Sequence, residues 1–226
     1  MSFTKVKKGV CAAKGFVANG LNCGLNSDKN KNDLALVYSE TQCQAAAVYT
    51  TNKVKGAPIQ VTKAHLEASG HTAKAVIANS KNANTCNADG VEKAQKMCEL
   101  AAAELSIDPN EVIVASTGVI GQVLPIEPIE SHIKELAKGL SADGNDKAVN
   151  AIMTTDTVPK QYAVKFMLGD SECIVGGMAK GSGMIHPNMA TTLNFITSDV
   201  AISSELIQKA LSEIVKVTYN CLSIDG

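Results

Sequence analysis

Two apolar runs in the second half of the chain constrain the fold more than any other feature of the sequence. Residues 162–167 and 172–178 are separated by a short stretch that contains Gly169-Asp170. A connection of this length between two strands suits a tight antiparallel hairpin. The chain is therefore expected to contain antiparallel pairing, which a purely parallel α/β sheet lacks.

Helices and further strands are intermixed with this hairpin along the whole sequence. The spacing of apolar side chains predicts helices over residues 59–69, 90–105, 126–140, 148–155 and 205–217. Ser203 or Ser204 would cap the last of them. Short strands are expected over residues 15–25, 34–38, 45–51 and 112–114. Because hairpins occur beside β–α alternation and no linker divides the chain, we predict one layered α+β domain.

Composition excludes several classes of function. The chain has 226 residues and a net charge of −1, and its 21 basic residues are all dispersed lysines, which does not fit a nucleic-acid interface. Without arginine, an anionic substrate must be bound by lysine, backbone N–H groups or hydroxyls. No apolar run has membrane-spanning or signal-peptide length, so a soluble, cytoplasmic protein is expected. The odd number of cysteines, 7, and the four scattered histidines predict reduced thiols and no metal centre.

Three polar segments could carry chemistry. Thr117-Gly118 follows the strand expected at 112–114 and could donate hydrogen bonds to an oxyanion, although a strand-ending turn explains the same residues. Thr154 belongs to a run of hydroxyls with a carboxylate, which could bind a polar ligand or form a helix-ending turn. Lys180 stands in a glycine-rich segment that does not match a phosphate-binding loop, and could neutralise a substrate carboxylate.

The pair Ala190-Thr191 offers a nucleophile. A small residue before a hydroxyl residue is the minimum requirement for an N→O acyl shift, which would cut the chain and leave Thr191 as a new N-terminus. A simple strand explains the same pair. If the cut occurs, the liberated α-amine titrates at about 7.7–8.0 and could serve as the base for the Thr191 hydroxyl.

Several motifs in one order resemble the ornithine acetyltransferase family, also called bifunctional glutamate N-acetyltransferases of arginine biosynthesis. The motifs are Ser116-Thr117-Gly118-Val119-Ile120-Gly121, Met153-Thr154-Thr155-Asp156-Thr157, Gly177-Met178-Ala179-Lys180-Gly181 and Pro187-Asn188-Met189-Ala190-Thr191. The resemblance runs from near the N-terminus to Gly226. It implies a layered αββα sandwich shared with certain self-cleaving aminopeptidases.

The resemblance also implies a mechanism. The precursor would cut itself between Ala190 and Thr191 into an α chain, residues 1–190, and a β chain that begins with residues 191–226, both in one structural unit and assembled as α2β2. Thr191 would carry an acetyl group from N-acetylornithine to glutamate. Thr117 and Gly118 match the oxyanion-stabilising pair, and Thr154, Lys180 and Thr191 match substrate-binding positions. No bound cofactor is implied; acetyl-CoA would enter only as an alternative acetyl donor.

Some residues depart from the family pattern. The family usually continues well past the position of Gly226, so the chain resembles a protein truncated at its C-terminus. Glycine is usual in the family where Lys81 stands. Two rival interpretations stay open: an N-terminal-nucleophile amidase or aminopeptidase of the same fold, and an inactive binding domain.

Overall fold

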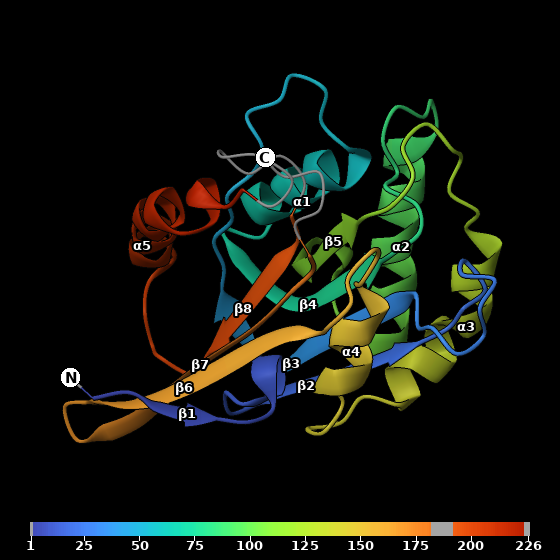
Figure 1. Cartoon of the computed structure of the whole chain (residues 1–226). Coiled ribbons are helices and arrows are strands. Elements are labelled where there is room, and N and C mark those ends of the chain that lie inside the picture. Colours follow the sequence, from blue (N-terminus) through green and yellow to red (C-terminus); the bar gives the residue numbers. More distant parts are fainter. Residues whose placement is uncertain (1, 182–191, 224–226) are drawn as a thin grey trace.

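The computed structural model describes residues 2–181 and 192–223 (Figure 1). Its strands form two four-stranded sheets. One sheet has the order β2-β3-β4-β5, with bounds Phe16–Leu21, Leu34–Gln44, Thr72–Asn79 and Val112–Ser116. The other has the order β1-β6-β7-β8, with bounds Thr4–Val6, Lys160–Leu168, Ser171–Ala179 and Asn194–Ser198. Within these sheets β4 and β5 pair in parallel, and the other neighbours are antiparallel.

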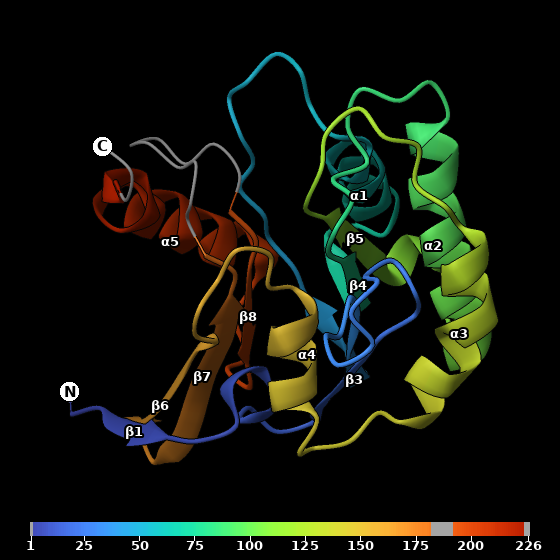
Figure 2. The ribbon, with the colours of Figure 1, turned by 45° about the vertical axis from the view of Figure 1, so that its right-hand side comes forward.

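Three helices cover one face of the β2–β5 sheet, as both views show (Figures 1 and 2). They are α1 (Ala57–Ala68), α2 (Gly90–Leu105) and α3 (Glu127–Lys138). Leu36 and Ile77 of the sheet are fully buried in the same cluster as Met97 of α2 and Leu136 of α3. Burying apolar side chains of this size stabilises the fold by about 1.5–3 kcal/mol each. Among the described residues this cluster is the larger of the two, so this layer forms the main core.

A second core fills the space between the two sheets. The short helix α4 (Asn145–Ala151) packs on β2 and β3, and the 3-10 turn η1 (Gly9–Cys11) contacts strands of both sheets. Val10, Val149 and Ile152 are buried there together with Met178 of β7. Figure 2 shows α4 between β7 and β3. The fold is thus a layered α+β sandwich, which confirms the predicted class.

The helix α5 (Ser204–Val217) lies on the opposite side of the molecule from α2 and α3 (Figures 1 and 2). Ser203 caps it, because its hydroxyl accepts a hydrogen bond from Leu206 N–H at 3.4 Å. Tyr162 and Ile196 both sit across from Gly177 and point away from the second core, and they are 56% and 55% exposed. The outward face of β6–β8 is therefore open to solvent. Two remaining 3-10 turns are η2 (Pro109–Glu111) and η3 (Tyr219–Cys221).

The hairpin expected around Gly169-Asp170 is confirmed: Leu168 pairs with Ser171, and Gly169 adopts φ +61°. Two other predictions are wrong. Residues 45–51 form no strand, because Gln44 already pairs with Thr72, the first residue of β4. The helix expected over 148–155 ends at Ala151.

Along the described parts of the chain, no helix combines the length and the apolar character that crossing a membrane requires.

Candidate active site

The parallel strands β4 and β5 end at the same edge of their sheet. Their last residues, Asn79 and Ser116, are register partners. The loops that follow are held together by backbone hydrogen bonds: Thr117 N–H donates to the Asn79 carbonyl and Val119 N–H donates to the Lys81 carbonyl, both at 3.0 Å. Thr117, whose hydroxyl is the predicted oxyanion donor, is therefore fixed in place by its own backbone and is 8% exposed.

Gly118 occupies a conformation that favours glycine. Its φ is +136°, and a Cβ at this position would overlap the backbone of Lys81 and Asn82. Asn82 strengthens the same junction, because its side-chain amide donates to the carbonyls of Gln122 and Val123 at 3.0 and 3.2 Å. The segment is thus a turn, as the simpler interpretation of the sequence expected, and this turn is rigid enough to hold two hydrogen-bond donors in a fixed geometry.

Lys180 is placed by the hairpin of β6 and β7. It follows Ala179, the last residue of β7, which pairs with Lys160, the first residue of β6. The backbone N–H of Lys180 donates to the Leu193 carbonyl at 3.0 Å, and the residue is 8% exposed. A lysine this deeply buried requires a negative partner, either from the protein or from a ligand.

The loop before β6 supplies that charge. The Asp156 carboxylate accepts a hydrogen bond from Lys160 Nζ at 2.8 Å and from Thr154 N–H at 3.0 Å. Burial alone would raise the pKa of the Asp156 carboxyl, but the bonds from Lys160 and Thr154 and the charges of Lys160 and Lys180 outweigh burial and lower it. Burial lowers the pKa of the Lys180 ammonium below its ordinary value, while the charge of Asp156 opposes that effect.

One large cavity, of about 1690 Å³, brings the predicted residues together. Thr117, Gly118, Thr154 and Lys180 all line it, together with Thr192. These residues come from positions far apart in the sequence: the loop after β5, the loop before β6, and the two sides of the β7–β8 connection. The cavity therefore combines two candidate oxyanion donors with a buried cation.

Two predicted residues, Ala190 and Thr191, lie outside the described residues, so the cleavage and nucleophile predictions are not tested by the geometry. Thr192, the next residue in sequence, is half-buried at the cavity.

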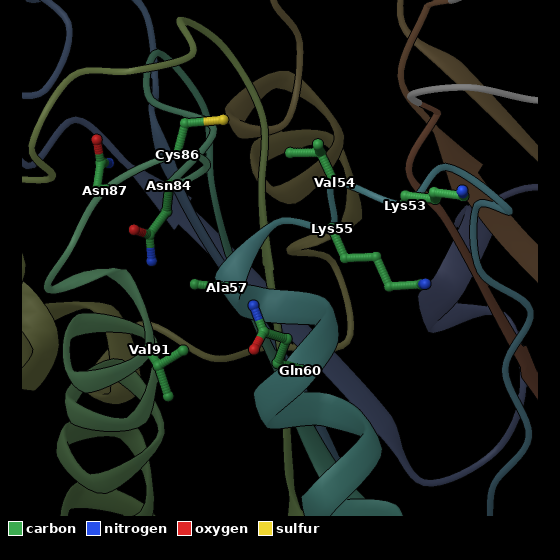
Figure 3. A pocket seen from close by; sticks show the side chains of 9 residues that line it. All are labelled: Lys53, Val54, Lys55, Ala57, Gln60, Asn84, Cys86, Asn87 and Val91. Atoms are coloured by element: carbon green, nitrogen blue, oxygen red, sulfur yellow. The ribbon is translucent and has the colours of Figure 1, made fainter.

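A second cavity, of about 470 Å³, lies at the beginnings of α1 and α2 (Figure 3). None of the predicted site residues lines it. Its two lysines, Lys53 and Lys55, direct their ammonium groups away from Asn84 and Cys86 in this view (Figure 3). In the part of the chain that the structure describes, no cluster of three or more His, Cys, Asp or Glu side chains could hold a metal ion.

Asp156 and Lys160 were not assigned a role from the sequence. In the sequence Asp156 is one polar residue of a hydroxyl-rich run, and Lys160 belongs to no motif. The i,i+4 spacing of an acid and a base was the one available signal, but on a surface helix such a spacing is common. Here the pair does not lie on a helix, because Lys160 is the first residue of β6. The Asp156 side chain is 1% exposed.

Solved structures define the fold class. The L-aminopeptidase D-Ala-esterase/amidase of Ochrobactrum anthropi, a variant of the Ntn hydrolase fold, superposes with a TM-score of 0.52 at 11% identity, over 96% of this chain and 71% of that one. At this identity the likeness shows the fold alone. The fold is the layered sandwich of that class, with the two candidate donors and a buried lysine lining one cavity.

The chain belongs to the ArgJ family, which matches residues 17–226. The arginine biosynthesis bifunctional protein ArgJ 1 of Clostridium acetobutylicum is 48% identical over 93% of this chain and 51% of its own length. The ArgJ protein of Bacillus subtilis is 47% identical over 98% of this chain and 54% of its own length. The chain thus spans about half the length of the curated relatives it matches.

Two solved relatives superpose on this chain more closely than the aminopeptidase does. The arginine biosynthesis bifunctional protein of Bacillus halodurans gives a TM-score of 0.77 at 38% identity, over 84% of this chain and 98% of that one. Ornithine acetyltransferase of Mycobacterium tuberculosis, solved with ornithine, gives a TM-score of 0.75 at 37% identity, over 85% of this chain and 100% of that one.

Proposed function

We propose that the protein is a self-processing glutamate N-acetyltransferase, which moves an acetyl group from N-acetylornithine to glutamate. The observation that carries this proposal is the shared cavity, which Thr117, Gly118, Thr154 and Lys180 all line together with Thr192. Membership of the ArgJ family supports the substrate class, and one solved relative is an ornithine acetyltransferase complexed with ornithine.

Processing comes first. The Thr191 hydroxyl attacks the Ala190 carbonyl carbon, the peptide C–N bond breaks in favour of an ester, and water hydrolyses the ester. The products are a carboxylate at Ala190 and a free α-amine at Thr191. The length of a solved relative supports this step. The alignment with the Bacillus halodurans chain takes in 84% of these 226 residues, which is about 190, and 98% of that chain, so that chain is about 190 residues long. A processed α chain of residues 1–190 has the same length.

Acetyl transfer then uses the new N-terminus. The Thr191 oxygen attacks the acetyl carbonyl carbon of N-acetylornithine while its α-amine takes the hydroxyl proton. The Thr117 hydroxyl and Gly118 N–H donate to the oxyanion that forms. The amide C–N bond breaks, the proton passes to the leaving amine, and ornithine departs. The amine of glutamate attacks the acetyl ester in the same way and regenerates Thr191.

Substrate binding falls to Thr154 and Lys180. The Lys180 ammonium neutralises the substrate α-carboxylate, which both N-acetylornithine and glutamate carry. The chemistry needs no bound cofactor; acetyl-CoA would act only as an alternative acetyl donor. The α and β chains stay associated, and two of each form the α2β2 assembly.

The test is an ornithine-release assay on the complete gene product, with and without glutamate. A transferase releases ornithine at a rate that depends on glutamate and forms N-acetylglutamate in equal amount. Release without any acceptor would instead identify an amidase of the same fold. No release and no acetylated threonine peptide would identify a binding domain. Replacing N-acetylornithine with acetyl-CoA in the same assay tests the second donor.

A further inference from the structure

We propose that Asp156 is a positioning residue: its carboxylate holds the turn that carries Thr154, lies against the backbone that follows Lys180, and provides a negative charge that acts on the Lys180 ammonium. The inference rests on the proposed function for the identity of the substrate carboxylate. Asp156 itself acts through its neighbours, because both of its oxygens are already engaged by protein groups: Oδ1 with Lys160 Nζ and Oδ2 with Thr154 N–H.

The geometry makes the Asp156 carboxylate a junction between two segments. On one side it accepts the backbone N–H of Thr154 at 3.0 Å, which fixes the turn that carries this residue. On the other side it lies against Gly181, where a Cβ would collide with Oδ1. The absence of a side chain at Gly181 therefore lets the backbone that follows Lys180 come close to the carboxylate.

Burial makes this junction strong. The Asp156 side chain is 1% exposed, whereas that of its ion-pair partner Lys160 is 43% exposed. A buried carboxylate is retained only where its hydrogen bonds and charge are compensated, and removing one partner of such a group has large effects. The half-exposed Lys160 gives that compensation from the solvent side, and the backbone of Gly181, the residue after Lys180, approaches the same carboxylate.

Asp156 and Lys160 affect Lys180 in opposite directions. These are the charged groups that influence Lys180 among the described residues. Burial is the largest effect and lowers the pKa of the Lys180 ammonium; the negative charge of Asp156 raises it, and the positive charge of Lys160 lowers it further. Asp156 thus preserves the ammonium form, which is the form that attracts a carboxylate.

Because Asp156 and Lys160 have opposite effects on Lys180, replacing each of them should shift its titration in opposite directions. In the complete gene product, the KM for N-acetylornithine is measured between about pH 7 and about pH 10 for wild type, Asp156→Asn and Lys160→Gln. KM rises as Lys180 loses its proton. Asp156→Asn should shift that rise to lower pH, and Lys160→Gln should shift it to higher pH. Because an α-amine also titrates in this range, the assignment of the midpoint to Lys180 comes from the NMR titration.

A second measurement does not depend on activity. The lysine side chains are labelled with ¹³C at Cε, the Lys180 signal is assigned by its loss in Lys180→Met, and its titration is followed by NMR in the same variants. Opposite displacements of the Lys180 midpoint support the proposal even if no acetyl transfer is detected, in which case only the proposed function fails. Displacements of the same sign, or an equal rise of KM at every pH with an unmoved midpoint, would overturn it.

Discussion

Gly118 lies directly against the backbone of Lys81. A Cβ at position 118 would overlap the Lys81 carbonyl group, and the amide nitrogen of Asn82 is equally close. The loops after β4 and β5 therefore meet at a point that glycine alone fits without displacing the backbone. Because Thr117 precedes this contact, the position of its hydroxyl depends on it.

We expect Gly118→Ala to lower both stability and activity. The substitution imposes an unfavourable φ and a backbone collision, which should reduce the free energy of unfolding by about 1–3 kcal/mol. Displacing an oxyanion donor should lower kcat by about 10²-fold. Gly121→Ala is the matched control, because Gly121 also has a positive φ, +79°, but open space around it. Equal losses in the two variants would argue against the contact with Lys81.

Thr117→Ala should separate catalysis from folding. The hydroxyl makes a small contribution to stability, so the melting temperature should stay near that of wild type. Removal of one oxyanion donor commonly lowers kcat by about 10²–10³-fold. Thr117→Ser retains the hydroxyl and should recover most of the turnover. Near-normal kcat in the alanine variant would remove Thr117 from the proposed role.

Lys81→Gly should stabilise the protein. Lys81 adopts φ +74°, in the left-handed region that side chains disfavour. Glycine at this position removes the strain, and the expected gain in the free energy of unfolding is about 1 kcal/mol after the larger entropy of unfolded glycine is allowed for. Chemical denaturation measures the change. Lys81→Ala keeps the Cβ and should give no such gain; an equal gain there would assign the effect to the lysine charge.

The buried thiols make stability depend on alkaline pH. Burial raises the pKa of the Cys98 thiol to about 12, and burial with the nearby Asp33 charge raises that of Cys23 to about 12. In the unfolded chain a thiol titrates at about 8.5. The unfolded state therefore loses protons first, and stability present below that pH is lost as the pH rises toward 12.

We accordingly expect the melting temperature to fall from about pH 8.5 upward, toward the value of about 12 that the folded thiols have. Cys98→Ala lowers the starting stability by opening a cavity but should make the fall less steep. Tyr49, whose pKa burial raises to about 12, contributes in the same direction and remains in both proteins. An identical pH dependence in the variant would show that Cys98 does not contribute.

Much of the fold could be predicted from local patterns. The helix over Gly90–Leu105 has the predicted bounds, since its apolar side chains recur at helical spacing on one face. The hairpin at Gly169 has a similarly local signal. Residues 45–51 were predicted wrongly, because their apolar composition suits a strand but the neighbouring strand begins too late to pair with them. Pairing depends on distant residues, which local spacing does not report.

The site could be predicted in part. Thr117, Gly118, Thr154 and Lys180 were named from motifs, and the structure places all four at one cavity. The contact that makes position 118 a glycine, and the approach of the Asp156 carboxylate to the backbone of Gly181, depend on how separate loops meet in three dimensions. Neither Lys81 nor Asp156 differs in its immediate sequence from an ordinary residue of a polar turn.

The central claim is that the Thr191 hydroxyl becomes a chain terminus before it carries the acetyl group. Intact mass spectrometry and N-terminal sequencing of the complete gene product, for wild type and for Thr191→Ala, test it most directly. The account predicts two wild-type fragments, the second beginning at Thr191, and one uncut inactive chain in the variant. An uncut wild-type protein that transfers acetyl groups at a normal rate would contradict it.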